Sequence, residues 1–270
     1  MKQSVITSFI SAAILCGISL PVQARDADER RYDRCLETAL RTPDKAINLA
    51  LVWQGEGGGV PARHCEAVGL YEMGEFAEAG IRLERIAEDM RIGKDMPIRR
   101  GKRIVASAEM LADMYGQAAN AWLLADETVN AEATINAALS LATKNSPQYA
   151  DLMLEKAQIF AADGSFGEAL RLIEQVIALD GERKEILIFA ASSARGSDNY
   201  ISAQRYLDEY QEHFPDNPTG YLERGNLEDA MGQFSLARKS WLKVIELDPE
   251  GIDAEAARAN LERLDLQVKE

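Results

Sequence analysis

Apolar and polar positions in the C-terminal half of the chain recur at a fixed interval. The turn residues Gly164, Asp198 and Gly232 are 34 residues apart, because 198 − 164 = 34 and 232 − 198 = 34. An aromatic residue, an alanine, a bulky apolar residue and a terminator follow each turn in the same register. Because the alanine comes three positions after the aromatic residue, both lie on one face of a helix. These further columns are Phe166, Tyr200 and Phe234; Ala169, Ala203 and Ala237; Ile173, Leu207 and Trp241; and Gly181, Pro215 and Pro249.

This pattern predicts a helical hairpin in each unit. A small residue lies mid-way along the first helix (Ala157, Ala191 or Gly225), where a neighbouring backbone can approach closely. Pro215 and Pro249 end the second helix, because proline cannot continue the hydrogen-bond ladder. A single hairpin cannot bury its apolar face, so neighbouring units must stack on it. We therefore expect an all-helical solenoid of about ten to twelve helices with no sheet.

The small residue, the Gly164-Ser165-Phe166 turn, Ala169, Ile173 and a terminator on a 34-residue period resemble the tetratricopeptide repeat (TPR) family. The resemblance implies an all-α, right-handed superhelical solenoid of TPR-like helix-turn-helix repeats. Three regular repeats then occupy 150–251, and 252–270 forms the C-terminal cap helix that such arrays need at their open end. The amphipathic positions of this cap are Ile252, Ala256, Ala259, Leu261 and Leu264.

The same pattern is present, less regularly, in the N-terminal half. Residues 60–149 are expected to hold further TPR-like repeats, and 25–59 a degenerate N-terminal helical hairpin. The period slips between Gly74 and Gly164, which are 164 − 74 = 90 residues apart. An apolar stripe at spacings of three and four predicts one long helix over about 99–126, or alternatively two shorter helices divided near Gly116. This stripe consists of Ile104, Ala108, Leu111, Tyr115, Ala118 and Trp122.

The first 24 residues have the pattern of a cleavable export signal. Lys2 precedes an uncharged, mostly apolar stretch from Val5 to Leu20, which at 20 − 4 = 16 residues is shorter than the roughly 20 that span a bilayer. We expect cleavage after Ala24, a periplasmic location, and no stable membrane insertion of the mature chain. A lipid-anchored cysteine at Cys16 is the alternative, but Leu15 stands where lipoprotein signals carry a small residue.

Two cysteines, Cys35 and Cys65, remain after this cleavage. In the oxidising environment of an exported chain they are expected to form one disulfide. A metal site that uses both cysteines and His64 is the alternative; no CxxC or HExxH spacing supports it.

Charge and composition disfavour two classes of function. The 270-residue chain has 44 acidic and 30 basic residues, a formal charge of −14, which opposes a general grip on nucleic acid. It has only two histidines, and no GxSxG motif surrounds a serine. We therefore expect neither catalysis nor a cofactor nor a metal.

The resemblance implies a concave groove, lined by first helices, that binds a peptide or protein. Residues 151, 185 and 219 flank this groove, and Leu154, Ile188 and Leu222 are alternatively core residues. We expect a non-catalytic periplasmic adaptor; the alternative is a structural or assembly subunit of an envelope complex that acts through self-association or its solenoid ends. The groove candidates are Tyr71, Trp122, Leu154, Gln158, Ile188, Ser192, Arg195, Leu222 and Asn226.

One cluster of cations contrasts with the acidic background. Six basic residues lie between Arg91 and Arg103, opposed only by Asp95. They form either a solvated surface or a docking patch for an acidic protein or anionic lipid. The core of this basic patch is Arg99, Arg100, Lys102 and Arg103.

Overall fold

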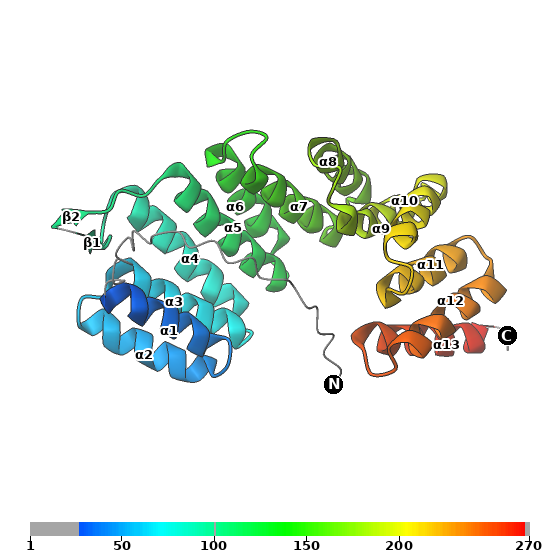
Figure 1. Cartoon of the computed structure of the whole chain (residues 1–270), viewed down its shortest axis with the longest axis horizontal. Helices are drawn as coiled ribbons and strands as arrows, with labels where there is room; N and C mark the ends of the chain where they lie inside the picture. Colours follow the sequence, from blue (N-terminus) through cyan, green and yellow to red (C-terminus); the bar gives the residue numbers. More distant parts are fainter. Residues whose placement is uncertain (1–26, 100, 268–270) are drawn as a thin grey trace, which may run out of the picture.

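The computed structural model describes residues 27–99 and 101–267, which form a curved array of antiparallel helices (Figure 1). Thirteen α-helices and one short 3-10 helix account for most of this part of the chain. They are α1 (Ala27–Ala39), α2 (Pro43–Gly55), α3 (Gly59–Glu72), α4 (Phe76–Arg91), α5 (Ala108–Leu124), α6 (Thr128–Leu141), α7 (Pro147–Ala162), α8 (Phe166–Leu179), η1 (Lys184–Ile186), α9 (Leu187–Gly196), α10 (Tyr200–His213), α11 (Pro218–Ala230), α12 (Phe234–Leu247) and α13 (Ile252–Gln267).

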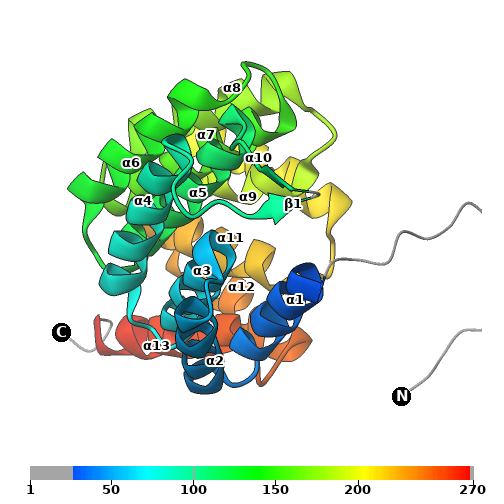
Figure 2. The same ribbon diagram turned by 90° about the vertical axis from the view of Figure 1, so that its left-hand side faces the viewer.

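The helices stack as hairpins into a solenoid with a closely packed inner layer. Each first helix packs against its second helix, as in α5 with α6 and α7 with α8. First helices also contact one another, α5 with α7 and α9 with α11. The inner side of the arch is therefore formed by first helices, with α6 and α8 on its outer rim (Figure 1). Seen from the N-terminal side, α1 to α3 lie in front of the C-terminal helices (Figure 2).

The column of turn residues has a common backbone geometry. Gly164, Asp198 and Gly232 have φ angles of 78°, 59° and 73°, in the left-handed region. In each turn the next residue donates its N–H to the carbonyl oxygen five positions earlier, for example Ser165 to Phe160 at 2.8 Å. This is the bond of a Schellman helix end, which favours glycine and tolerates aspartate. The periodic Gly/Asp column thus marks the ends of the first helices.

The small residues in the first helices make room for large side chains of the second helices. A Cβ atom built on Gly225 would lie 2.4 Å from Nε1 of Trp241, which is fully buried. Trp241 also packs with Ala254, Ala257 and Leu264 of the last helix. Helix α13 therefore covers the apolar face of α12, as a cap helix should.

The expected helix over 99–126 is wrong in its first part. Two short strands, β1 (Ile98–Arg99) and β2 (Lys102–Arg103), pair antiparallel, and Gly101 at φ 74° lies between them. This pair of two-residue strands is a small exception to the all-helical solenoid, which the described residues otherwise confirm. Helix α5 begins only after Ser107, whose hydroxyl accepts the N–H of Met110, and it continues through Gly116, so the alternative of two helices is also wrong.

The hairpin explains why the sequence period slips. Asp126 has φ 61° and is the turn residue of the α5–α6 unit. It lies 126 − 74 = 52 residues after Gly74, which is 18 residues more than one 34-residue period. The segment 92–107 and its neighbours supply these extra residues. Ile104 fits the apolar stripe of the sequence because it packs against the same core as α5, although it lies in a non-helical segment.

The N-terminal helices are tied together by the expected disulfide. Cys35 of α1 and Cys65 of α3 are joined, with their Cα atoms 6.0 Å apart. Both are buried with Ala39, Ala46 and Ala50. The prediction of an intrachain disulfide is confirmed, and the alternative metal site loses both of its thiol ligands. The expected signal peptide, residues 1–24, lies outside the described residues. Among the helices that are described, none is long and apolar enough to cross a bilayer.

Candidate functional site

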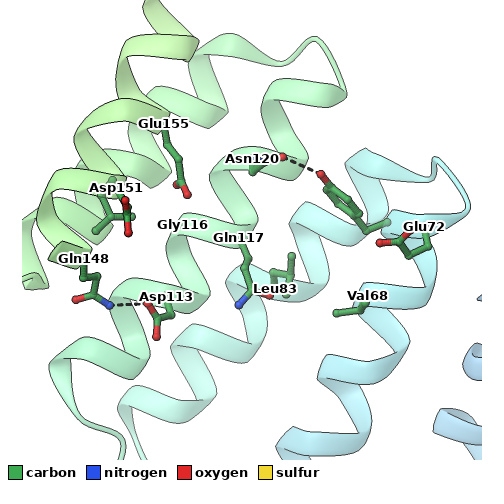
Figure 3. Close-up of a pocket in the computed structure, with 12 residues that line it drawn as sticks. Val68, Glu72, Leu83, Asp113, Gly116, Gln117, Asn120, Gln148, Asp151 and Glu155 are labelled. Carbon is green, nitrogen blue, oxygen red and sulfur yellow. Dashed lines mark hydrogen bonds between the residues drawn. The ribbon is translucent and has the colours of Figure 1, made fainter. Parts of the chain in front are cut away.

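The first part of the candidate site is a pocket on the inner side of the arch, between α3, α5 and α7. It has a volume of about 580 Å³. Its floor includes Leu83 of α4, and its walls carry amide and carboxylate side chains (Figure 3). The lining residues are Val68, Tyr71, Glu72, Leu83, Asp113, Gly116, Gln117, Asn120, Gln148, Asp151, Leu152 and Glu155.

Helical spacing places these side chains on facing surfaces. On α5, Asp113, Gln117 and Asn120 are four and three residues apart and so share one face of the helix. On α7, Gln148, Asp151 and Glu155 follow the same rule. Gly116 lets the two helices approach, because a Cβ there would lie 2.9 Å from Leu152 and 3.3 Å from Oε2 of Glu155.

Hydrogen bonds link the three helices across the pocket. The Tyr71 hydroxyl donates to Oδ1 of Asn120 at 2.9 Å, which joins α3 to α5. Nε2 of Gln148 donates to Oδ1 of Asp113 at 2.6 Å and to the carbonyl oxygen of Glu109 at 2.9 Å, which joins α7 to α5 (Figure 3). The walls are thus held in place without any ligand.

The lining of this pocket is acidic. Its lining contains four carboxylates, from Glu72, Asp113, Asp151 and Glu155, and no lysine or arginine. Oε2 of Glu155 is buried and has no hydrogen-bond partner within the described part of the chain. Burial, followed by the charges of Asp151 and Asp113, raises the pKa of Glu155 from 4.5 to about 7. A cation in this pocket would meet the carboxylates of Glu72 and Asp113, neither of which forms an ion pair within the described residues, whereas Asp151 is paired with Arg183.

A second pocket continues the groove from α7 to α9 with a volume of about 450 Å³. Asp151 and Glu155 line both pockets, so the two are continuous. The second pocket is more apolar, with Leu154 and Ala161 on its wall and Phe189, whose side chain is 45% exposed. Arg183 at its edge donates to Oδ1 of Asp151 at 2.7 Å. The groove therefore becomes more apolar toward α9.

Some of the sequence-predicted residues lie in this groove. Tyr71 lines the first pocket, and Leu154, Gln158 and Ser192 line the second. Leu154 also packs against the core, so both interpretations of it describe part of its surface. The flanking residues Asp151 and Glu185 line the second pocket as well.

The other predicted groove residues are occupied elsewhere. Ile188 and Leu222 are partly buried against the cores of their own units, as the alternative interpretation had it, and neither lines a groove pocket. Trp122 is buried and donates its Nε1–H to Glu84 at 3.1 Å. Arg195 donates to Oε1 of Glu223 at 2.7 Å, and Oδ1 of Asn226 accepts from Trp241 at 3.2 Å.

Several groove residues were not identified from the sequence. Asp113, Gln117 and Asn120 belong to α5, whose register was obscured by the slip in the repeat. Glu155 and Gln148 lie one helical turn from the predicted stripe on α7. The spacing of three and four that connects them to Asp151 was the available signal.

The remaining sequence candidates are the basic patch and the buried histidine. Lys102 and the backbone of Arg99 belong to the hairpin, Arg103 donates to the carbonyl oxygen of Gly93 at 3.2 Å, and Arg100 lies outside the described residues. In the described part of the chain, no group of three or more His, Cys, Asp or Glu side chains could hold a metal ion. His64 is buried with both ring nitrogens in hydrogen bonds, to Tyr32 at 2.5 Å and Gln117 at 2.8 Å.

Comparison with known proteins identifies the fold. No family model matches the sequence, and no curated protein matches it. Solved structures match well in shape: the C-terminal part of a TPR repeat-containing protein from Cytophaga hutchinsonii has a TM-score of 0.59 at 17% identity, over 84% of this chain and 82% of that one. Pseudomonas aeruginosa pilF gives 0.57 at 13% identity, over 87% and 100%. The MamA protein gives 0.51 at 16% identity, over 68% and 90%. The chain has the fold of a TPR solenoid, as the sequence predicts.

Proposed function

We propose that this protein is a non-catalytic adaptor of the periplasm whose inner groove binds an extended, basic segment of a partner protein. The observation that carries the proposal is the continuous groove over α3, α5, α7 and α9, with four carboxylates and no basic residue in its first pocket. The TPR fold supports a role in protein interaction, since stacked repeats present long concave binding surfaces. The export signal expected in residues 1–24 supports the periplasmic location.

The size of the groove suits a short extended peptide. Packed helices lie about 8 to 10 Å apart, so three steps from α3 to α9 span roughly 25 to 30 Å. An extended chain rises about 3.3 Å per residue, which gives a bound segment of roughly eight to nine residues. Such a segment would cross both pockets.

The chemistry of the two pockets differs in a way that sets the order of side chains in the partner. A lysine or arginine side chain fits the first pocket, where Asp113 and Glu155 face it with carboxylates. An apolar side chain fits the second pocket against Leu154 and Phe189. A bound cation would lower the pKa of Glu155, so binding near pH 7 would release a proton.

Site-specific photocrosslinking in the source cell tests this proposal. A photoreactive benzoyl-phenylalanine replaces Gln158 or Phe189 in the groove, and Ile201, 87% exposed on α10, is the control position. We expect adducts from both groove positions and none from Ile201. The crosslinked segment of the partner should contain a lysine or arginine beside an apolar residue.

The same experiment distinguishes the alternative role. If the protein acts as an assembly subunit through its solenoid ends, the groove positions give no adduct. Adducts with a segment that lacks basic residues would contradict the acidic pocket as the recognition element. Adding Asp113→Asn and Asp151→Asn should reduce the groove adduct several-fold, since each exposed ion pair contributes about 0.2–1 kcal/mol.

A further inference from the structure

The segment between α4 and α5 is the part of the array that the repeat does not require. It extends from Ile92 to Ser107 and carries the hairpin β1–β2, which projects beyond the helices at the N-terminal end of the arch (Figure 1). The hairpin is held at its base, where the N–H of Ile104 donates to the carbonyl oxygen of Pro97 at 2.8 Å. Its tip is the turn at Gly101.

This segment combines cations with exposed aliphatic side chains. Ile92, Ile98 and Val105 are 72%, 62% and 86% exposed. Lys102 and Arg103 are also exposed, and no carboxylate of the described residues forms an ion pair with either of them. In the pairing of the strands, Ile98 lies directly opposite Arg103, so an aliphatic and a basic side chain share one face of the ribbon.

The acidic residues near the hairpin are engaged elsewhere or lie at its base. Asp89 forms ion pairs with Arg63 at 2.5 Å and Lys94 at 3.1 Å, and Asp95 lies 3.7 Å from Arg63. Asp28 and Glu29 of α1 line the pocket behind Pro97 and Ile98. Arg103 lines a pocket with Asp28 and Asp95, but neither of these carboxylates forms an ion pair with it, so Lys102 and Arg103 add positive charge to the hairpin although the whole chain has a formal charge of −14.

From this combination we infer that the hairpin segment, residues 92–99 and 101–105, attaches the protein to an anionic membrane surface. Basic side chains are attracted to anionic headgroups, and exposed aliphatic side chains enter the boundary between headgroups and acyl chains. The two contributions add, so a segment that carries both binds such a surface more strongly than a segment that carries either one. We commit to a bilayer because an exposed aliphatic side chain, Ile98, lies directly opposite a basic one, Arg103, and this combination suits the boundary between anionic headgroups and acyl chains.

This attachment is independent of the groove, because the hairpin and the two groove pockets share no residue. It would hold the adaptor at the membrane by its N-terminal end. The groove, on the inner side of the arch, would remain open to a partner.

Vesicle flotation of the mature chain tests the inference. The probes are vesicles of phosphatidylcholine alone and vesicles in which about one third of the lipid is phosphatidylglycerol. We expect the protein to float with the anionic vesicles only. The floated fraction should fall sharply at about 0.5 M salt, where the Debye length is about 4 Å.

Two pairs of substitutions separate the contributions of charge and of aliphatic side chains. Lys102→Gln with Arg103→Gln should weaken partition into anionic vesicles about tenfold or more, since each basic residue near such a surface contributes several-fold. Ile98→Ser with Val105→Ser should weaken it by a similar factor, because the aliphatic contribution is lost while the charge is kept. All variants should melt at the wild-type temperature, since the side chains are exposed.

Matched variants elsewhere on the surface control for general effects. Val129→Ser with Ile201→Ser removes two aliphatic side chains that are 80% and 87% exposed, and Lys144→Gln with Lys239→Gln removes two exposed lysines. Both control variants should float like the wild type. The inference is overturned if the wild type does not float with anionic vesicles at low salt, which would favour an acidic protein as the partner of the hairpin. It is also overturned if Ile98→Ser with Val105→Ser floats unchanged, or if the control pairs weaken flotation equally.

Discussion

Replacing Glu155 by glutamine should make the folded protein more stable above pH 7 and leave its stability nearly unchanged near pH 4. The carboxyl of Glu155 is packed against Gly116, with Oε2 buried and without a hydrogen-bond partner in the described structure. Burial and the charges of Asp151 and Asp113 raise its pKa from 4.5 to about 7. Ionisation of Glu155 therefore destabilises the folded state relative to the unfolded chain.

The sign and size of the effect follow from proton linkage. Between pH 4.5 and 7 the folded state binds more protons at Glu155 than the unfolded state, so the free energy of unfolding falls as pH rises. A shift of this size corresponds to about 3 kcal/mol at full development, since one pKa unit is about 1.4 kcal/mol. The wild type has lost this contribution to its free energy of unfolding just above pH 7. Glutamine does not ionise, so Glu155→Gln keeps its stability as the pH rises.

Urea unfolding of the wild type and of Glu155→Gln at several pH values between 4 and 8.5 measures this difference. The stability gained by the variant should be near zero at pH 4, grow through pH 5 to 7, and level off at about 2 to 3 kcal/mol. Glu212→Gln, at an exposed position of α10, is the control and should show no such pH dependence. A gain in stability for Glu155→Gln that is equal at pH 4 and pH 8 would refute the conclusion that Glu155 has a buried carboxyl with a raised pKa.

Three further predictions concern the disulfide, the turns and export. Reduction of Cys35–Cys65, which closes a 30-residue separation, should lower the free energy of unfolding by about 3 to 4 kcal/mol, and titration of the unreduced, unfolded mature chain should find no free thiol. Gly164→Ala should cost about 1 kcal/mol in urea unfolding because its φ is 78°, whereas Asp126→Gly, at φ 61°, should be neutral or stabilising; a harmless Gly164→Ala would contradict the role of the turn column. N-terminal sequencing of the exported protein should begin at Arg25, and a lipid-modified start at Cys16 would contradict cleavage after Ala24.

The fold could be predicted from the sequence because its regular features are local. Each turn needs a left-handed residue, and each close helix contact needs a small one, so Gly164, Asp198 and Gly232 mark the helix ends and Gly225 marks the approach of Trp241. The sequence analysis did not predict the hairpin β1–β2. Ile104 packs against the core that it shares with α5, so its apolar position is in register with the helix although Ile104 is not part of it. An apolar stripe indicates which residues face a core, and it does not exclude a break in the backbone.

The groove could be predicted only in part for a similar reason. The repeat places Tyr71, Leu154 and Gln158 on first helices, and the structure places them in the groove. Ile188 and Leu222 have equivalent positions in the repeat but turn toward their own cores, because the packing of each unit differs in detail. The charge of the first pocket arises from carboxylates of α3, α5 and α7 together. The pattern within a single repeat does not show that these carboxylates lie close to one another.

Selection from a phage-displayed library of random peptides of about ten residues tests the central claim most directly. Peptides enriched on the mature protein should carry lysine or arginine beside an apolar residue, and Asp113→Asn with Asp151→Asn and Glu155→Gln should abolish the enrichment of basic residues. Glu168→Gln with Glu212→Gln and Glu255→Gln removes three exposed carboxylates outside the groove and should leave that enrichment intact, which separates the groove from the general attraction of an acidic protein. Basic peptides that remain enriched after the groove carboxylates are neutralised, or no enrichment at all on the wild type, would contradict the claim that the groove recognises a basic segment.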